Sequence, residues 1–571
     1  MILEQIESKY TLEEIKTVAD RLFPFRTPDG GPSYNVGQEE SIIQTVDAFL
    51  NKGRTHVVLE APTGIGKTAI ARTIYYTLRS LLNQRFRATI HTTTIGLQDQ
   101  YVAEDSKVFS LKGKRNYQCT APVASASCTY GSNECRQLCR DGDCNPKLSC
   151  PYILNRERWT KVEDLRVTNS SMMVTLPHIL CTGENGSDLM VLDECHKMKN
   201  TLRDHCTMRF DYRSSGNHKR KGAPNSEVIH QTVHEVFQYC CDRYRKGDMV
   251  DIPNELREII RELSQPLTEA TNVMAGLMKK GVGGKYLITL NEAMEYYQNL
   301  ASYVDIMTST SADKFVVDDI TDTAITFKPV FAKDVAEFSL YSKADYFLHM
   351  SATICGTKKY VDDMGIPKDR VEILEIDNPI PLENRVIHYL PVGKINAKAT
   401  PEIYQKLVDG IDEIIDSHEG QNGLIHTVSY KLAEMIKRQS KHGKRIWIGR
   451  DRKETMEALR RGAESGRGII VASPSMEEGY DLKHDLGRFC IIAKVPYAYL
   501  GDPLIKYVCS KDPGSYQQEA VLRIVQACGR CVRGVDDFGT TYILDEGFGN
   551  LTRFGGEYMQ NWFLDGVQMH D

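Results

Sequence analysis

The stretch of sequence that decides the fold is Ala61-Pro62-Thr63-Gly64-Ile65-Gly66-Lys67-Thr68. Before it, residues 55–61 form a short apolar run with β-branched side chains, which predicts a buried strand, and after it residues 68–82 predict a helix. A glycine-rich turn in this position presents backbone N–H groups and the positive end of a helix to phosphate groups. The stretch therefore has the pattern of a P-loop, although Ala61 stands where glycine is usual.

The P-loop pattern assigns chemistry to two of its side chains. The ammonium group of Lys67 would reach the β- and γ-phosphates of ATP, and the hydroxyl group of Thr68 would bind Mg²⁺. We expect the backbone of residues 61–68 to surround the phosphates. The alternative is a glycine-rich turn without function, which the strand before it and the helix after it make less favourable.

Apolar runs along the rest of the chain predict two α/β domains. The first domain would contain four strands, at residues 55–61, 87–92, 188–192 and 345–350. It would also contain a helix that begins at about Gly96. A second α/β domain is predicted from about residue 357, with strands at 422–427, 444–448, 468–473, 489–495 and 540–545. Such alternation of strands and helices is typical of doubly wound parallel sheets.

The acidic box Asp193-Glu194-Cys195-His196 directly follows the apolar strand 188–192. The carboxylate of Asp193 should therefore emerge at the carboxyl edge of the sheet, where ligands bind. There Asp193 can hold Mg²⁺, and Glu194 can act as the general base for an attacking water. The alternative is an acidic pair that caps a helix start.

Two arginines stand three positions apart in the segment Gln526-Ala527-Cys528-Gly529-Arg530-Cys531-Val532-Arg533. This spacing predicts that Arg530 and Arg533 lie on one face of a helix. A guanidinium group suits a transferring γ-phosphoryl group, because its charge is spread over a planar fork. The alternative is a basic helix face in contact with solvent.

The composition is that of a globular protein with several domains. The chain has 571 residues, of which 41% are hydrophobic and 26% charged. No apolar run reaches the roughly 18 residues that a membrane span needs, and the N-terminus lacks the pattern of a secretory signal. We therefore expect a cytoplasmic protein that does not bind membranes. Association with the nucleoid and a monomeric state are further expectations. A net charge of −5 argues against a large basic surface, but it does not exclude a narrow basic channel.

Six of the 16 cysteines fall within 32 residues: Cys119, Cys128, Cys135, Cys139, Cys144 and Cys150. Structural disulfides are not expected in a cytosolic chain. Four thiolates can hold an iron–sulfur cluster or a zinc ion. The absence of a CxxC pair from this group favours the cluster.

Taken in order, these motifs resemble those of the XPD/DinG family of iron–sulfur helicases in superfamily 2. Gly37-Gln38 matches the glutamine box, without the arginine that often precedes it, and Ser351-Ala352-Thr353 matches motif III. Further matches are His91-Thr92-Thr93-Thr94, Leu97-Gln98-Asp99-Gln100, Val167-Thr168-Asn169, Ser429-Tyr430 in motif IV, Glu478-Gly479-Tyr480-Asp481-Leu482 in motif V, and residues 526–533 in motif VI. After Asp545 many relatives have arginine, whereas this chain has Glu546.

The resemblance implies two RecA-like lobes with ATP between them, and it implies an iron–sulfur domain and a helical arch inserted in lobe 1. The corresponding boundaries would be lobe 1 in three parts at 1–108, 166–199 and 336–356, an iron–sulfur domain at 109–165, an arch at 200–335 and lobe 2 at 357–571. The resemblance also implies that Gln38, Gly479 and Asp481 take part in nucleotide binding. His196 and Gln526 would couple the nucleotide state to closure of the lobes.

The resemblance further implies a [4Fe–4S] cluster. Cys119 and Cys150 each stand in a run similar to the family's, at Lys112-Gly113-Lys114-Arg115-Asn116-Tyr117-Gln118-Cys119 and at Cys150-Pro151-Tyr152. Cys139 and Cys144 are the other two expected ligands, because the spacing from Cys139 to Cys150 resembles the DinG branch. Cys128 is the main rival, Cys135 is the second candidate to replace Cys139, and zinc remains the chemical alternative.

The expected function is that of an ATP-dependent helicase that moves 5′→3′ on single-stranded DNA and uses ATP, Mg²⁺ and the cluster. Its expected partners are single-stranded DNA and DNA forks, with RNA–DNA hybrids as a further partner. The alternative is a nucleic-acid-stimulated ATPase that remodels nucleoprotein complexes without processive unwinding. An RNA helicase of the DEAH type is disfavoured, because the 126 residues from Lys67 to Asp193 leave room for a cysteine-rich insertion that those proteins lack.

Overall fold

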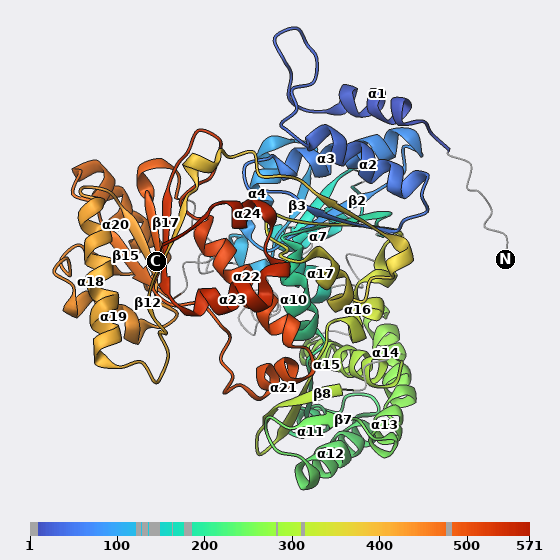
Figure 1. Cartoon of the computed structure of the whole chain (residues 1–571). Helices are drawn as coiled ribbons and strands as arrows, with labels where there is room; N and C mark the ends of the chain where they lie inside the picture. The colour runs from blue at the N-terminus through green and yellow to red at the C-terminus, as the bar shows by residue number, and fades with distance from the viewer. Residues whose placement is uncertain are drawn as a thin grey trace.

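The computed structural model describes residues 9–120, 127, 135, 149–162, 164–175, 186–280, 284–309, 314–474 and 482–570. Within these residues, the chain forms two seven-stranded parallel sheets and one four-stranded antiparallel sheet. Figure 1 shows the first parallel sheet at the upper right, the second at the left and the antiparallel sheet at the bottom. We call the two units built on the parallel sheets the first and second lobes.

The sheet of the first lobe has the strand order β11-β1-β10-β5-β2-β4-β3. Its strands are β1 (His56–Glu60), β2 (Ala88–Thr92), β3 (Phe109–Leu111), β4 (Arg166–Asn169), β5 (Leu189–Asp193), β10 (Tyr346–Ser351) and β11 (Val371–Glu375). The four strands expected from the sequence are confirmed as the central strands of this sheet. The unexpected strands β3, β4 and β11 are edge or next-to-edge strands, and each is too short or too polar to give a distinct apolar run.

Side chains alternate between the two faces of the first sheet, as they must in extended strands. Val57 and Leu59 pack into a core under one layer of helices, whereas Val58 faces a second core on the opposite side. The first layer contains α1 (Leu12–Leu22), α2 (Gln38–Leu50) and α3 (Lys67–Leu81). The second layer contains α10 (Met198–His205), α16 (Lys333–Ser339) and α17 (Thr357–Asp363). Further helices of this lobe are α4 (Ile95–Glu104), α7 (Pro151–Trp159) and α8 (Ser170–Thr175).

The sheet of the second lobe has the strand order β14-β15-β13-β16-β17-β12-β18. Its strands are β12 (Ile387–Gly393), β13 (Gly423–His426), β14 (Ile446–Ile448), β15 (Ile470–Ser473), β16 (Phe489–Ile492), β17 (Thr540–Asp545) and β18 (Val567–Met569). All five strands expected here are confirmed. The helices are α18 (Pro401–Ser417), α19 (Tyr430–Gln439), α20 (Arg452–Ser465), α21 (Pro503–Lys511), α22 (Pro513–Cys528), α23 (Gly547–Gly555) and α24 (Asn561–Asp565).

Two expected boundaries are wrong. The first lobe does not end at residue 356, because β11 returns after α17 and pairs with β1. The cysteine-rich insertion does not begin at residue 109, because β3 pairs with β4 inside the first sheet. In both cases a short edge strand extends the sheet beyond the point at which the strong apolar runs end.

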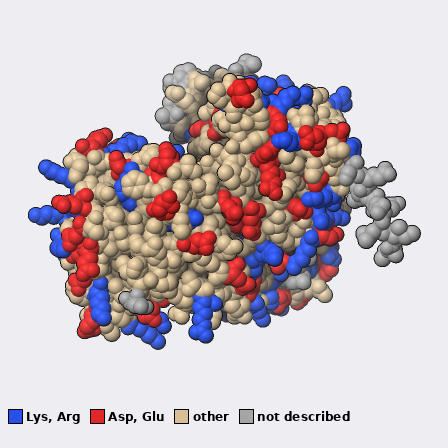
Figure 2. Space-filling model, turned by 45° about the horizontal axis from the view of Figure 1, so that its top comes forward, with Lys and Arg blue, Asp and Glu red and all other residues tan. Residues whose placement is uncertain are grey.

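The surface carries charges of both signs. Figure 2 shows Lys and Arg side chains interspersed with Asp and Glu side chains over the face drawn. This distribution agrees with the small net charge of the chain. Among the described residues, no helix has both the length and the apolar character that a membrane span requires.

Residues 208–329 form an inserted unit between α10 and α16 of the first lobe. Its helices are α11 (Tyr212–Arg220), α12 (Ser226–Arg243), α13 (Asn254–Arg261), α14 (Ser264–Lys279) and α15 (Gly284–Ser309). The helical pattern expected for 200–335 is therefore present. The unit also contains an unexpected antiparallel sheet of β6 (Met208–Asp211), β9 (Ala324–Pro329), β8 (Lys314–Ile320) and β7 (Met249–Asp251).

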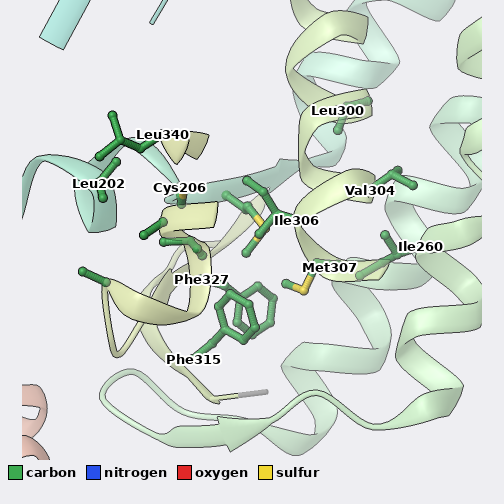
Figure 3. Packing of buried hydrophobic residues seen from close by; sticks show 14 of the residues in the cluster. Leu202, Cys206, Ile260, Leu300, Val304, Ile306, Met307, Phe315, Phe327 and Leu340 are labelled. Atoms are coloured by element: carbon green, nitrogen blue, oxygen red, sulfur yellow. The ribbon is translucent and has the colours of Figure 1, made fainter. Parts of the chain in front are cut away.

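The inserted unit is joined to the first lobe by a continuous hydrophobic core. Figure 3 shows Phe315 and Phe327 of its sheet close to Ile306 and Met307 of α15, with Leu202 of α10 nearby. Strand β6, where the chain enters the unit, pairs with β9, where it leaves. Shared apolar burial and paired entry and exit strands fix the unit on the lobe.

Candidate nucleotide site between the two lobes

The P-loop connects the end of β1 to the start of α3. Gly66 precedes the helix with a positive φ of 85°, and Lys67 is the first helical residue. The backbone N–H of Ala61 donates a 2.9 Å hydrogen bond to the carbonyl of Ser351, so the loop begins beside the end of β10. Strand, turn and helix therefore occur in the order that the sequence predicted.

The side chain of Gln38 supports the P-loop from behind. Its Nε2 atom donates to the carbonyl of Ile65 at 2.5 Å, and its Oε1 atom accepts from the backbone N–H of Asn35 at 2.7 Å. Only 1% of this residue is exposed. The amide of Gln38 is thus bound to protein atoms on both sides, and it fixes the loop through Ile65.

Asp193 and Thr68 share a buried neighbour, Tyr101 of α4. The phenolic oxygen of Tyr101 donates to a carboxylate oxygen of Asp193 at 3.2 Å and also forms a hydrogen bond with the hydroxyl of Thr68. The amide of Gln100 donates to the same Thr68 hydroxyl at 3.4 Å. The two side chains that the sequence assigned to Mg²⁺ therefore lie together, and an alcohol with a carboxylate is a donor set that suits this hard cation.

The charges of Asp193, Glu194 and Lys67 influence one another. Burial raises the pKa of Asp193, the adjacent Glu194 charge raises it further, and the ammonium group of Lys67 opposes both effects. Burial also acts to raise the pKa of Glu194, but Lys67, His196, Lys197 and the hydrogen bond from Ser351 together outweigh it, and the net shift is downward. Glu194 therefore stays ionised and can accept a proton or a hydrogen bond.

A chain of hydrogen bonds leads from Glu194 across to the second lobe. Ser351 Oγ donates to the Glu194 carboxylate at 3.0 Å, and His196 Nδ1 lies 2.9 Å from the same Ser351 oxygen. Gln526 Nε2 of α22 lies 3.0 Å from His196 Nε2 and 3.1 Å from the hydroxyl of Thr353. All these bonds are satisfied when the proton of His196 is on Nδ1.

The arginine pair does not lie on a helix, so this expectation is wrong. Helix α22 ends at Cys528, and both arginines lie in the loop that follows it. That loop reaches the first lobe: a Cβ atom at Gly64 would lie only 2.9 Å from the carbonyl oxygen of Arg533. Gly64 has a φ of 85°, and its lack of a side chain allows the two loops to approach.

The structure therefore brings together, between the two lobes, most of the residues that the sequence selected. These are residues 61–68, Asp193, Glu194, His196, Gln526 and the main chain of Arg533. Arg530 lies close enough to the buried ring of His426 in β13 that its charge adds to burial in lowering the pKa of that histidine to about 3. Gly479 and Asp481 lie outside the described residues.

Two protein-family models match the chain, one in each lobe. The model described as the res subunit of type III restriction enzymes matches residues 33–215, and a helicase C-terminal domain model matches residues 411–566. The first match contains the P-loop and the acidic box, and the second contains the Gln526–Arg533 segment.

Several curated helicases are similar over nearly their whole length. A probable ATP-dependent helicase of Methanocaldococcus jannaschii is 21% identical, with 97% of this chain and 98% of that protein covered. The ATP-dependent DNA helicase DinG of Photobacterium profundum is 20% identical over 95% of this chain and 96% of its own. A solved XPD helicase has the same fold, with a TM-score of 0.55, 13% identity and coverage of 93% and 99%. By these matches the chain is an ATP-dependent helicase, similar over nearly its whole length to helicases of the XPD/DinG kind.

In this helicase, the two lobes are RecA-like, and the site between them is the position expected for ATP hydrolysis. Sequence reasoning missed several side chains that build the site. Tyr101 was not selected, although it directly follows the Leu97–Gln100 match, and Gln518 and Gln560 of the second lobe had no signal at all. These two glutamines lie far along the chain from their partners, so no local pattern could reveal them.

The cysteine-rich segment of the helicase is described at its two ends and at residues 127 and 135, where Cys135 is partly exposed. The residues next to Cys119 and Cys150 are in contact, since the hydroxyl of Thr120 donates to the carbonyl of Ser149 at 2.8 Å. Cys150 is buried and Cys119 partly exposed. The expected ligands Cys139 and Cys144, and their rival Cys128, lie outside the described residues. Among the described residues, no group of three or more metal-binding side chains gathers.

Proposed function

We propose that this helicase unwinds DNA by moving 5′→3′ along single-stranded DNA, and that it carries a [4Fe–4S] cluster. The observation that carries this proposal is the pair of insertions in the first lobe. One lies between β3 and β4 and contains the cysteines, and the other is the inserted unit at 208–329. Both insertions project from the lobe that contains the P-loop. Both can therefore contact the single-stranded DNA along which the enzyme would move.

The nucleotide roles follow from the positions of the side chains. Lys67 would contact the β- and γ-phosphates of ATP, and Thr68 and Asp193 would hold Mg²⁺, which neutralises phosphate charge when bound. Glu194, ionised and bonded to Ser351, would orient and deprotonate the attacking water. Gln38 would keep the P-loop in its binding conformation through Ile65.

The second lobe would complete the site by closing onto the first. Arg530 and Arg533 would stabilise the charge on the transferring γ-phosphoryl group. When the lobes close, Gln526 would bind His196. The hydrogen bonds of Ser351 would then connect His196 to Glu194. Hydrolysis would remove the group that holds the lobes together, so each cycle would open them and shift one lobe along the strand.

The proposed nucleic-acid partners are single-stranded DNA and DNA forks, with RNA–DNA hybrids as a further substrate. Binding should rest mostly on phosphate contacts, so it should be nearly independent of sequence and should weaken with salt. The mixed surface charges of Figure 2 favour a confined path over a broad basic surface. We further propose that the enzyme acts as a monomer on DNA in the cytoplasm or nucleoid, and that Gly479 and Asp481 assist nucleotide binding.

The proposed cluster fits what is described of the cysteine-rich segment. The Thr120–Ser149 hydrogen bond holds its two ends together, which allows Cys119 and Cys150 to be ligands of one cluster. Cys139 and Cys144 are the two remaining ligands that we propose. The cluster would serve as a structural crosslink between these four positions.

The test of polarity uses two partial duplexes that differ only in carrying a 5′ or a 3′ single-stranded tail. The assay is run at low salt to preserve phosphate contacts, with Lys67→Ala protein as the control for ATP dependence. We expect strand displacement from the 5′-tailed substrate. Preferential displacement from the 3′-tailed substrate would overturn the polarity.

The same assay distinguishes the proposed helicase from a second candidate function. If neither duplex is displaced while single-stranded DNA still stimulates ATP hydrolysis, the chain is a nucleic-acid-stimulated ATPase that remodels nucleoprotein complexes. Iron content and the visible spectrum of protein purified without air test the cluster independently. About four iron atoms per chain are expected for a [4Fe–4S] centre.

A further inference from the structure

A tight turn of the first lobe, residues 353–356, is held by side chains of the second lobe. The turn follows Ser351 at the end of β10, and it contains Cys355 with a φ of 57° and Gly356 with a φ of 91°. Ile354 and Cys355 are buried. Positive φ is costly for a residue other than glycine, so neighbouring groups must hold Cys355 in this conformation.

One carboxylate oxygen of Glu60 accepts three hydrogen bonds at this turn. The backbone N–H groups of Ile354 and Cys355 donate to Oε1 at 2.5 and 3.0 Å, and Nε2 of Gln560 donates to the same atom at 2.6 Å. The first two donors belong to the first lobe. Gln560 belongs to the second lobe and also contacts the sulfur of Cys355 at 3.5 Å.

Two further side chains of the second lobe complete the contact. Gln518 Nε2 donates to the carbonyl of Cys355 at 2.9 Å, while its Oε1 accepts from Lys199 at 3.1 Å. Tyr558 covers Gly356 so closely that a Cβ atom there would lie 2.7 Å from its ring carbon Cδ1. We call Gln518, Tyr558 and Gln560 the clasp.

The clasp lies next to groups that hydrolyse ATP. Glu60 directly precedes Ala61 of the P-loop, and the turn lies two residues after Ser351, which bonds Glu194. Opening the lobes would separate Gln560 from Glu60, a residue that is only 4% exposed in this structure. A buried carboxylate that loses a donor is destabilised, so the clasp favours closure.

We propose that Gln560, together with Gln518, is a positioning residue for ATP hydrolysis. It holds Glu60 and the turn 353–356 in place when the lobes are closed, and it thereby stabilises the state in which the Arg533 loop lies on the P-loop. The proposal rests on ATP hydrolysis between the lobes, and it is independent of DNA polarity and of the cluster.

The test compares single and double variants in DNA-stimulated ATP hydrolysis. Gln560→Ala should lower kcat/KM about tenfold, because it removes one buried hydrogen bond to a charged group. Gln560→Glu should lower it further, because two carboxylates would then face each other. Adding Glu60→Gln to Gln560→Glu restores a donor–acceptor pair and should return kcat/KM to within about threefold of wild type. Gln405→Glu, which adds the same charge at an exposed position of α18, is the matched control.

A second measurement separates positioning from folding. Hydrogen exchange at the turn 353–356 is compared with and without a non-hydrolysable ATP analogue. In the wild type the analogue should protect the N–H groups of Ile354 and Cys355, and in Gln560→Ala this nucleotide-dependent gain should be lost. A general loss of stability would instead lower protection equally in both conditions, and that result would overturn the proposal.

The outcomes distinguish this proposal from the proposed function. If the wild type hydrolyses ATP and Gln560→Glu hydrolyses it equally well, the clasp has no role in positioning. If the double variant stays as impaired as Gln560→Glu while the control is active, the Glu60–Gln560 pair is not the coupled element. If the wild type itself hydrolyses no ATP, the proposed function fails first.

Discussion

The phenolic oxygen of Tyr101 donates a 3.2 Å hydrogen bond to the carboxylate of Asp193. Both side chains are buried, and burial keeps the pKa of Tyr101 well above its ordinary value, so the phenol stays protonated and remains a donor. Tyr101 also contacts Thr68. One side chain outside the selected motifs thus orients both proposed Mg²⁺ ligands.

Tyr101→Phe should weaken the binding of Mg²⁺ without removing the proposed Mg²⁺ ligands. The variant loses one oxygen atom, so Asp193 and Thr68 would be less well oriented, and the Mg²⁺ concentration for half-maximal ATP hydrolysis should rise roughly tenfold. The measurement is a Mg²⁺ titration at saturating ATP. Tyr76→Phe is the matched control, because it removes a tyrosine–carboxylate bond to Asp105 away from the site. An unchanged titration for Tyr101→Phe would contradict the role.

Lys67→Ala should nearly abolish ATP turnover while the fold remains. Lys67 is half-buried at the start of α3, so its removal leaves no cavity in the core, but it removes the positive charge next to Asp193 and Glu194. We expect a loss on the order of 10³-fold in kcat. Thermal unfolding checks the fold, and the exposed Lys107→Ala serves as the control. Near wild-type turnover would refute the P-loop assignment.

Gln38→Ala should slow the hydrolysis of different nucleotides to the same extent. Because its amide is bound to Ile65 and Asn35, we expect it to position the P-loop and not to select the base. Loss of this buried bond should lower kcat/KM about tenfold for both ATP and GTP, as expected for one hydrogen bond of this kind. Parallel titrations with the two nucleotides check this. A loss confined to ATP would show that Gln38 reads adenine after all.

Cys119→Ser or Cys150→Ser should release iron and abolish unwinding while some ATP hydrolysis persists. The two cysteines lie at the ends of an insertion that is outside the site containing Lys67 and Asp193. Iron content, visible absorbance and ATPase activity are measured on the same preparations. Cys241→Ser, a partly exposed cysteine of the inserted unit, is the matched control.

The choice among the remaining ligands has its own test. Cys128→Ser should be milder than Cys139→Ser or Cys144→Ser. Bleaching by Cys128→Ser, with colour retained in Cys139→Ser, would show that the ligand set is wrong. Zinc in place of iron in the wild type would show that the metal is wrong.

The sequence alone was sufficient for the features that local patterns control. The strand–turn–helix around Lys67 and the strand that ends at Asp193 occupy the predicted positions, because apolar runs of buried strands and glycine turns are short-range signals. Both sheets could likewise be assigned to the parallel α/β class from their central strands.

Only the tertiary structure decided which segments meet. Edge strand β11 joins β1, the chain leaves α22 at Gly529 before either arginine, and Gln560 reaches Glu60 across 500 residues of sequence. Each of these depends on how the chain crosses between layers and how the lobes close, which no window of neighbouring residues contains. Such contacts are important for stability, because a polar group that is buried without a hydrogen-bond partner costs free energy.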